Sequence, residues 1–225
     1  MEIKAVLCDL DNTLIDFRNY KDKSINSAVA AMRKRGLDVS QEDGVKGVWD
    51  IYWEKGWEHK EVFQTFLSRV EGEVDYSLLA TAIHAYRDER NKNMRTYKRV
   101  KPTLRNLRDW GYKLGIVSDA PKLKAWLRLE YLGIIDYFDV VVAFEDTFKF
   151  KPDSAPFMKA LDSLGIEPVN ALFIGDNVER DVVGANNLGM LSVFAVYGNV
   201  FEVDKSGADF DIHSFSELEL ILDKS

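Results

Sequence analysis

Short apolar runs alternate with longer amphipathic segments along most of the chain. Five runs are rich in branched and aromatic apolar residues: residues 3–10, 113–118, 138–144, 171–175 and 191–196. Continuous runs of this length are typical of strands that are covered on both faces of a sheet. The pattern therefore predicts a buried strand at each of these places.

The segments between the runs have the periodicity of amphipathic helices, and they are residues 103–110, 121–131, 155–164 and 179–188. Asp153 or Ser154 is a suitable cap for the third segment. Gly165 and Gly189 are suitable stops for the third and the fourth. Because strands and helices alternate, the sequence predicts an α/β fold with a mainly parallel sheet.

Residues 16–94 interrupt this alternation, because they contain helical periodicity and almost no strand-like run. Helices are expected at residues 24–34, 42–55, 60–69 and 76–93, with the return to the sheet near residues 95–100. Two domains are therefore predicted: a core of residues 1–15 and 95–225, and an inserted helical domain of residues 16–94. The aromatic run WDIYWEKGW in the insertion is expected mainly to pack helix against helix, with substrate contact as the alternative.

Composition and charge narrow the classes of partner. The chain has 225 residues, of which 46% are hydrophobic and 30% charged, as in ordinary folded proteins. A formal net charge of −7 argues against general binding to nucleic acid or to an anionic membrane surface. No run reaches the roughly 18 apolar residues of a membrane helix, and no leader-like segment opens the chain. We expect a cytoplasmic protein, and an inert core position for the single cysteine, Cys8.

Charged and hydroxyl side chains follow the predicted strands. Asp9 and Asp11 stand two residues apart at the end of the first run, where strand geometry points both to one side. Carboxylates this close repel each other unless a cation or a shared proton compensates. Later strand ends supply Ser118, Asp119, Lys151, Asp176 and Asp181.

The carboxyl ends of the strands in an open α/β sheet are where ligands bind. Carboxylate oxygens are hard ligands that suit magnesium, whereas a hydroxyl group and an ammonium group suit the oxygens of a phosphate. The residue types at this edge therefore predict a site for a divalent cation and a phosphate group.

Four segments together resemble the signatures of the haloacid dehalogenase superfamily. In chain order they are DLDNTLID at residues 9–16, VSDA at residues 117–120, KPD at residues 151–153 and GDNVERD at residues 175–181. Within the superfamily the chain most resembles the phosphoglycolate-phosphatase-like branch. The resemblance implies a Rossmann-like core, with residues 16–94 as an α-helical cap.

The resemblance also implies roles for the first signature and for a metal ion. Asp9 would attack phosphorus and form a phosphoaspartate, and Asp11 would protonate the leaving oxygen and then activate water. The implied cofactor is Mg2+, held by Asp9, Asp176 and the backbone carbonyl group of Asp11.

The remaining implied roles concern the phosphate group. Ser118, Asp119 and Lys151 would bind it, while Asp181, assisted by Asn177, would orient the lysine or a metal-bound water. Lys149 is a rival for the lysine position, but the proline after Lys151 matches the superfamily.

The predicted function is a magnesium-dependent phosphatase that hydrolyses a small phosphate monoester. A 2-haloacid dehalogenase-type hydrolase and a phosphomutase are the alternatives. Halide leaves without a proton, and the dehalogenase branch lacks an acid at the position of Asp11, so the phosphatase is favoured. The predicted partner is a small phosphorylated metabolite, and the protein is expected to be a monomer or a homodimer. The identity of the metabolite is left open.

Overall fold

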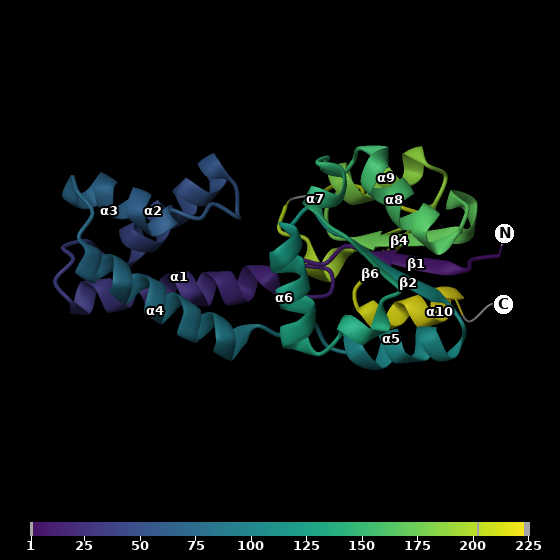
Figure 1. The fold of residues 1–225 in the computed structure, drawn as a ribbon, viewed down its shortest axis with the longest axis horizontal. Helices are drawn as coiled ribbons and strands as arrows, with labels where there is room; N and C mark the ends of the chain where they lie inside the picture. The colour runs from purple at the N-terminus through teal and green to yellow at the C-terminus, as the bar shows by residue number, and fades with distance from the viewer. Residues whose placement is uncertain (1, 202, 223–225) are drawn as a thin grey trace. The chain divides into compact units, whose positions relative to one another are not determined.

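The computed structural model describes residues 2–201 and 203–222. These residues form two compact units, one of residues up to Asp16 together with those from Arg95 onward, and the other of Phe17–Met94. The first unit contains the sheet, and the second contains only helices (Figure 1). That each unit is a separate folding domain, with boundaries at residues 15/16 and 94/95, stays a prediction.

Within the described residues the sheet has six strands: β1 (Ala5–Cys8), β2 (Lys113–Val117), β3 (Val140–Val142), β4 (Ala171–Gly175), β5 (Leu191–Ala195) and β6 (Phe210–Ile212). Their order is β3-β2-β1-β4-β5-β6, and every neighbouring pair is parallel. The predicted α/β fold with a parallel sheet and a helical insertion is therefore confirmed. The sequence reading missed β6, a three-residue strand in which Phe210 and Asp211 are exposed and no apolar run forms.

Strand β1 lies at the centre of the sheet, and its register places the site. Cys8 lies opposite Ile116 of β2 and Ile174 of β4, so the three strands end side by side. All four residues of β1 are buried. Because the strands are parallel, the residues that follow them emerge at one edge of the sheet.

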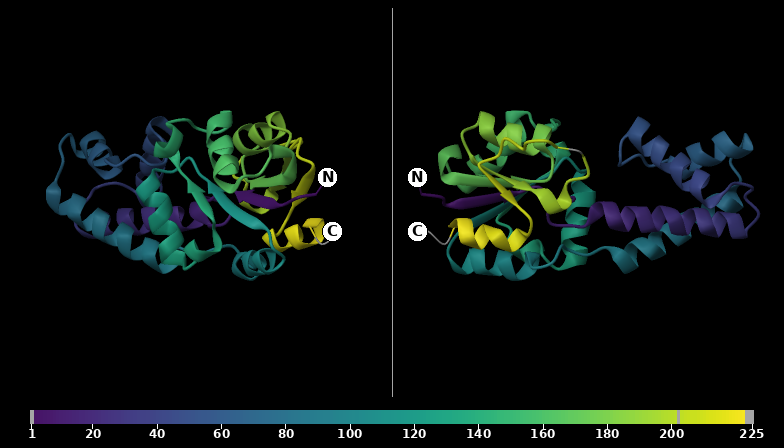
Figure 2. Two further views of the ribbon diagram at one scale, coloured as in Figure 1. Left: turned by 45° about the vertical axis from the view of Figure 1, so that its right-hand side comes forward. Right: turned by 180° about the vertical axis from the view of Figure 1, so that it is seen from behind.

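Helices cover both faces of this sheet. Helix α8 (Ser154–Leu164) and helix α9 (Val183–Asn187) lie on one face, and α5 (Val100–Asp109) and α10 (Leu218–Leu222) on the other (Figures 1 and 2). The α8 face is held by an apolar cluster in which Phe157 packs edge-on against Phe173 of β4. Helix α6 (Lys122–Leu132) and the short helix α7 (Phe144–Thr147) complete the unit.

Two predicted elements of the core differ from the structure. The third strand ends at Val142, because the Asp146 carboxylate accepts a hydrogen bond from the backbone N of Ala143 and starts α7. The fourth predicted helix is split into a π-helical turn, Val178–Val182, and α9. The predicted cap of α8 is confirmed, because the Asp153 carboxylate accepts from the backbone N of Ala155 at 2.9 Å.

The helical unit consists of α1 (Phe17–Lys34), α2 (Gln41–Lys55), α3 (Val62–Glu71) and α4 (Tyr76–Asn93). Helix α1 begins at Phe17 rather than near residue 24, because Phe17 and Tyr20 are already buried. In the aromatic run, Trp49 and Tyr52 are buried in the core of this unit, whereas the Trp53 side chain is 51% exposed. No helix of the described residues has both the length and the hydropathy needed to cross a membrane.

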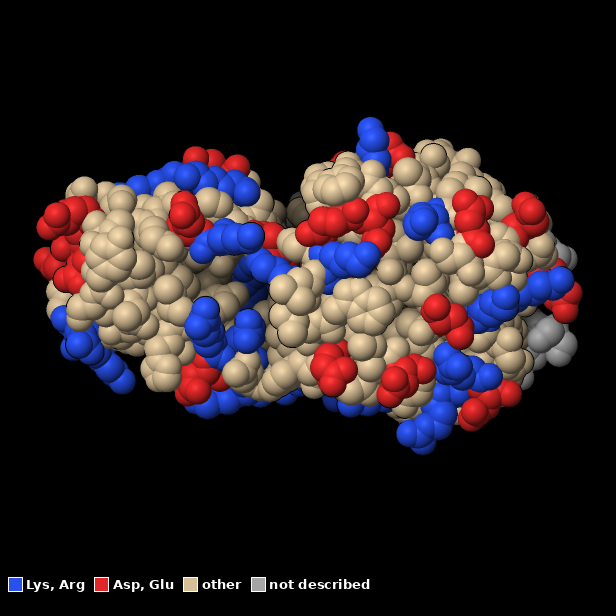
Figure 3. Space-filling model, in the orientation of Figure 1, with Lys and Arg blue, Asp and Glu red and all other residues tan. Residues whose placement is uncertain are grey.

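Charged side chains cover the surface in a mixed pattern. Figure 3 shows acidic and basic residues interspersed on the face that it presents of each unit. A surface on which both signs alternate produces no extended field of one sign.

Candidate active site

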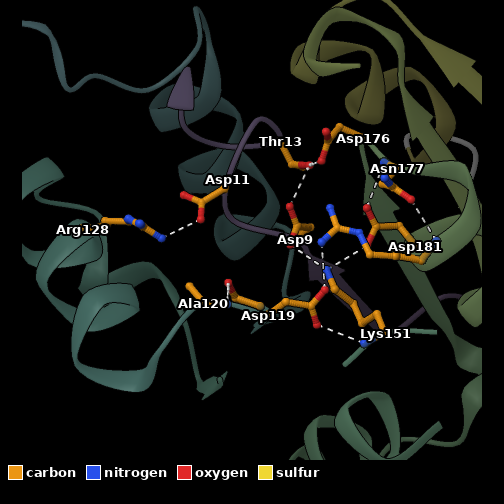
Figure 4. Close-up of polar contacts among 12 residues, drawn as sticks. Asp9, Asp11, Thr13, Asp119, Ala120, Arg128, Lys151, Asp176, Asn177 and Asp181 are labelled. Carbon is orange, nitrogen blue, oxygen red and sulfur yellow. Dashed lines mark hydrogen bonds and ion pairs between the residues drawn. The ribbon is translucent and has the colours of Figure 1, made fainter. Parts of the chain in front are cut away.

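Asp9 follows β1 directly and continues its pairing with β4. Its backbone N donates to the carbonyl O of Ile174 at 2.9 Å, which keeps the residue in line with the sheet. The residue is only 6% exposed, and its carboxylate Oδ1 lies 2.6 Å from the Nζ of Lys151 (Figure 4). The end of the central strand therefore presents a buried carboxylate that is fixed on both its backbone and its side chain.

Lys151 lies between two carboxylates. Its Nζ is 2.6 Å from Asp9 Oδ1 and 2.7 Å from Asp181 Oδ1, and the side chain is buried. Burial alone would lower the pKa of Lys151, but attraction to Asp181 and Asp9 outweighs burial and raises it. Lys149, which the sequence left as the alternative, is largely exposed, and its Nζ lies 4.0 Å from Asp153 Oδ2. The lysine that contacts the Asp9 carboxylate is thus Lys151.

Three buried carboxylates converge beside this lysine. Asp9, Asp176 and Asp181 each offer an oxygen, and these oxygens lie within 4.8 Å of one another. Burial raises the pKa of Asp9 to about 6, against the lowering effect of the Lys151 ammonium group. Burial, with repulsion from Asp9 and Asp181, also raises the pKa of Asp176. Such a cluster of hard oxygen donors fits a divalent cation, whose charge would offset both the burial and the repulsion that raise the two pKa values.

The hydroxyl group of Thr13 joins this cluster. Its Oγ1 lies 3.4 Å from Asp9 Oδ2 and 3.5 Å from Asp176 Oδ1, at the upper limit of a hydrogen bond. The loop that carries Thr13 is held by the segment after β5, because the Tyr197 hydroxyl donates to the Thr13 carbonyl O at 2.8 Å. Gly198 lies so close to this loop that an added Cβ would come 1.6 Å from the carbonyl O of Asn12.

Asp11 points away from the three carboxylates. Its Oδ2 lies 2.5 Å from Nη1 of Arg128 on α6, and Figure 4 shows the side chain directed toward that arginine. The turn after Asp11 is tight, because the Asn12 backbone N donates to Ile15 O at 2.7 Å and Asn12 has a φ of +61°. The predicted metal contact of Asp11 was its backbone carbonyl group, and that contact stays a prediction.

The loop after β2 carries Ser118 and Asp119. Ser118 is buried, and its Oγ accepts from the backbone N of Ala120 at 3.2 Å. The Asp119 carboxylate accepts from the backbone N of Lys151 at 3.0 Å and pairs with Arg180 at 3.1 Å. The Asp119 side chain thus links three of the four signature segments, while the phosphate-binding role predicted for Ser118 and Asp119 stays a prediction.

The loop after β4 depends on a glycine and on the π-helical turn. The Asp181 carboxylate folds back to accept from the backbone N of Asn177 at 3.0 Å. An added Cβ on Gly175 would lie 2.3 Å from the Asp181 carboxylate. The Asn177 side chain in turn accepts from the backbone N of Arg180 at 3.0 Å. Glycine is therefore the residue that allows Asp181 to reach Lys151.

Sequence reasoning missed several residues of this region, namely Thr13, Arg128, Arg180 and Tyr197. Thr13 and Arg180 lie inside the quoted signatures, so their positions were a usable signal. Arg128 lies in the middle of a helix, and Tyr197 lies in the short 3-10 helix Val196–Gly198. At neither position does a local pattern mark a contact with a distant strand end.

Comparison with known proteins identifies the family of the chain. The model of the haloacid dehalogenase-like hydrolase family matches residues 6–195, which include all four signature segments. The chain belongs to this family. The predictions that the chain is an enzyme, and that it is a hydrolase of this family, are thereby confirmed.

Similar proteins extend over nearly the whole chain. A glyceraldehyde 3-phosphate phosphatase of Methanopyrus kandleri is 34% identical over 222 residues, 96% of this chain and 95% of that protein. The pyrophosphatase PpaX of Bacillus cereus is 30% identical over 196 residues, 84% of this chain and 81% of that protein. The solved structure of a HAD phosphatase from Thermococcus onnurineus has a TM-score of 0.72 at 28% identity and covers 98% of both chains.

Proposed function

We propose that the chain is a magnesium-dependent phosphatase that hydrolyses a small phosphate monoester through a phosphoaspartate on Asp9. The observation that carries the proposal is the buried Asp9 carboxylate, held 2.6 Å from Lys151 beside two further carboxylates. The names of the similar phosphatases support the same reaction class.

The metal site would be formed by Asp9 and Asp176. Their carboxylate oxygens are hard donors, and burial together with repulsion within the carboxylate cluster raises the pKa of both, which supports a cation as their partner. Asp181 is also near, but its Oδ1 pairs with Lys151, which favours the orienting role predicted for it. When bound, magnesium would supply positive charge that neutralises the carboxylates and the oxygens of the incoming phosphate.

Asp9 would be the nucleophile. A carboxylate oxygen of Asp9 forms a bond to phosphorus while the bond from phosphorus to the ester oxygen breaks. Lys151 holds Asp9 in place, and its ammonium group attracts the phosphate oxygens. Asp11 donates a proton to the departing ester oxygen, which an alkyl leaving group requires.

The second half of the reaction restores Asp9. Asp11, now a carboxylate, takes a proton from water, and the water oxygen attacks phosphorus. The bond from phosphorus to Asp9 breaks, and inorganic phosphate leaves. One aspartate thus carries the phosphoryl group while the other moves the proton.

Other reactions of the family fit this chain less well. A dehalogenase releases halide, which needs no proton, so Asp11 would have no task. A phosphomutase needs residues that hold a second phosphate group, and no such residues can be named in the insertion. Two relatives of about 30% identity or more are named for different substrates, glyceraldehyde 3-phosphate and pyrophosphate. We therefore propose a small phosphorylated metabolite as the substrate class, with glyceraldehyde 3-phosphate as the first candidate.

A substrate panel with and without magnesium tests the proposal. The purified protein is assayed for phosphate release from glyceraldehyde 3-phosphate, phosphoglycolate, hexose phosphates, nucleoside monophosphates and pyrophosphate. Asp9→Asn is expected to abolish release, whereas Asp136→Asn, at an exposed aspartate, serves as the matched control. Full activity after complete chelation of divalent metal would contradict the proposal.

A further inference from the structure

Arg128 is a buried cation that belongs to none of the four signature segments. It lies on α6, and its side chain is 8% exposed. Its neighbours along the same face of the helix, Ala125, Leu129 and Leu132, are buried apolar residues. An arginine on such a face covers its aliphatic stem and directs its guanidinium group to a specific partner. A partner of Arg128 in the structure is the carboxylate of Asp11, at 2.5 Å.

This pair involves the residue that has to move a proton. The guanidinium group of Arg128 donates to Asp11 Oδ2, so this oxygen is occupied while the pair is formed. Asp11 held in this way is not available to a leaving group. The side chain also points toward Arg128 and away from Asp9, which is where a leaving oxygen would lie (Figure 4).

We propose that Arg128 is a positioning residue that holds Asp11 in a retracted place between turnovers. Asp11 must leave Arg128 before it can reach the leaving oxygen, and it returns to Arg128 when the turnover ends. The inference rests on the proposed phosphatase function, because it assumes that Asp11 is the acid.

The contacts of the other carboxylates support the idea that Asp11, unlike them, is held away from the cluster. Asp9 is fixed by Lys151, and Asp181 is fixed by Lys151 and by the backbone N of Asn177. The Asp11 side chain is 23% exposed, compared with 9% for Asp9 and 1% for Asp181. A retracted Asp11 also keeps a further negative charge away from the three clustered carboxylates before the phosphate arrives.

The first test compares leaving groups in Arg128→Met, which keeps much of the apolar stem and removes the charge. The measured quantity is the ratio of kcat/KM for an alkyl phosphate to kcat/KM for p-nitrophenyl phosphate, whose leaving group departs without a proton. Loss of the charge-assisted bond frees Asp11, so we expect this ratio to rise by about tenfold. Arg128→Lys retains a cation and should stay near the parent ratio. Arg108→Met, which removes a half-exposed partner of Asp139, should leave the ratio unchanged.

A second test separates this inference from general damage. In an Asp11→Asn background, where turnover stalls after the first step, the ratio is taken from single-turnover rate constants for the release of the alcohol or phenol. Arg128→Met should no longer change this ratio, because the acid on which it acts is absent. An unchanged or lowered ratio in Arg128→Met alone would overturn the inference. Activity of the parent protein on p-nitrophenyl phosphate tests the proposed function itself, so the two failures are distinguishable.

A third test needs no variant. Crystals of the parent protein are grown free and with magnesium and beryllium trifluoride, a mimic of the phosphoryl group on Asp9. We expect the contact between Asp11 and Arg128 in the free crystals and its loss in the analogue complex. The inference is wrong if Asp11 remains on Arg128 in both.

Discussion

At the scale of single residues, the described residues of the candidate active site include more buried carboxylates than cationic groups to pair with them. Lys151 serves two carboxylates, Asp9 and Asp181, while Asp176 adds a third within 4.8 Å of them. Burial makes this excess of negative charge costly, and the raised pKa values of Asp9 and Asp176 express that cost. Such an arrangement is consistent with the proposed binding of a cation and then of an anion that the cation attracts.

Substitutions of the two aspartates Asp9 and Asp11 should block different steps of the reaction. Asp9→Asn should abolish turnover of every ester, because an amide is too weak a nucleophile. Asp11→Asn should keep the first step with p-nitrophenyl phosphate and then stall, because hydrolysis of the phosphoenzyme lacks its base. Rapid-quench kinetics should show a burst approaching one equivalent of p-nitrophenol per site, and intact-protein mass spectrometry should show phosphate on the protein. Turnover of alkyl phosphates at the parent rate by Asp11→Asn would refute this division of roles.

Magnesium affinity should depend on pH through the same carboxylates. Asp9 and Asp176 bind metal in the ionised form, and raised pKa values mean that protons compete with the metal as the pH falls. With a pKa of about 6 for Asp9, the affinity at pH 5.5 should be lower than at pH 7.5 by about fourfold or more. Isothermal titration calorimetry in buffers of different ionisation enthalpy should also show proton release on binding at the lower pH. Equal affinities at the two pH values, without proton release, would speak against this account.

At the scale of elements, the site depends on how each loop leaves its strand. Strand β4 ends in Gly175, and the π-helical turn that follows brings Asp181 back over that glycine. Widened helical turns of this kind are frequent at functional sites. The loop after β5 secures the loop after β1 through the hydroxyl group of Tyr197.

Gly175→Ala should therefore lower the activity by displacing Asp181, while strand β4 stays folded. The new Cβ would lie 2.3 Å from the Asp181 carboxylate and would force it away from Lys151. We expect kcat/KM to fall by about tenfold or more, since displacement of positioned groups by an ångström is costly. Ala171→Gly, at the other end of β4, controls for a general effect of changing the strand. A fall of the same size in that control would show that the loss comes from the strand and not from Asp181.

At the scale of the whole molecule, the helical unit is inserted between two residues of the core that are hydrogen-bonded to each other. The core residues Asp16 and Arg95 flank the helical unit, and the backbone N of Asp16 donates to Arg95 O at 3.2 Å. Within the described residues, the carboxylate cluster and Lys151 all belong to the core unit. The helical unit has its own buried core, which includes Ile51 and Phe66.

Replacement of Phe17–Met94 by a short linker should consequently leave a core that folds and retains part of its activity on aryl phosphates. Asp16 and Arg95 are already hydrogen-bonded neighbours, so a few residues can bridge them without strain. The discrimination among metabolites should be lost, because the proposed cap would no longer enclose the leaving group. Circular dichroism checks the fold, and kcat/KM across the substrate panel measures the discrimination. An unchanged ranking of metabolites in the folded variant would disprove the role of the cap.

The sequence by itself determined the fold class and most of the strand ends. The apolar runs of β1, β2, β4 and β5 are long enough to identify buried strands, whereas the three residues of β6 are too few and too exposed. Parallel strands share one edge, so the residues that follow them could be expected to converge. The order of these runs therefore predicts Asp9, Lys151 and Asp176 as residues of one site.

Only the tertiary structure decided which groups touch. Helical periodicity marks the position of Arg128 as buried, but it carries no information about a partner on a distant loop. The contact between Asp11 and Arg128 exists because the fold brings a residue of α6 to the loop that follows β1. Gly175 opens the fourth signature segment, but the reason that it must be a glycine follows from the path of Asp181 in the folded structure. Local patterns specify elements because they arise from backbone periodicity, and contacts between residues far apart in sequence arise only when those elements pack.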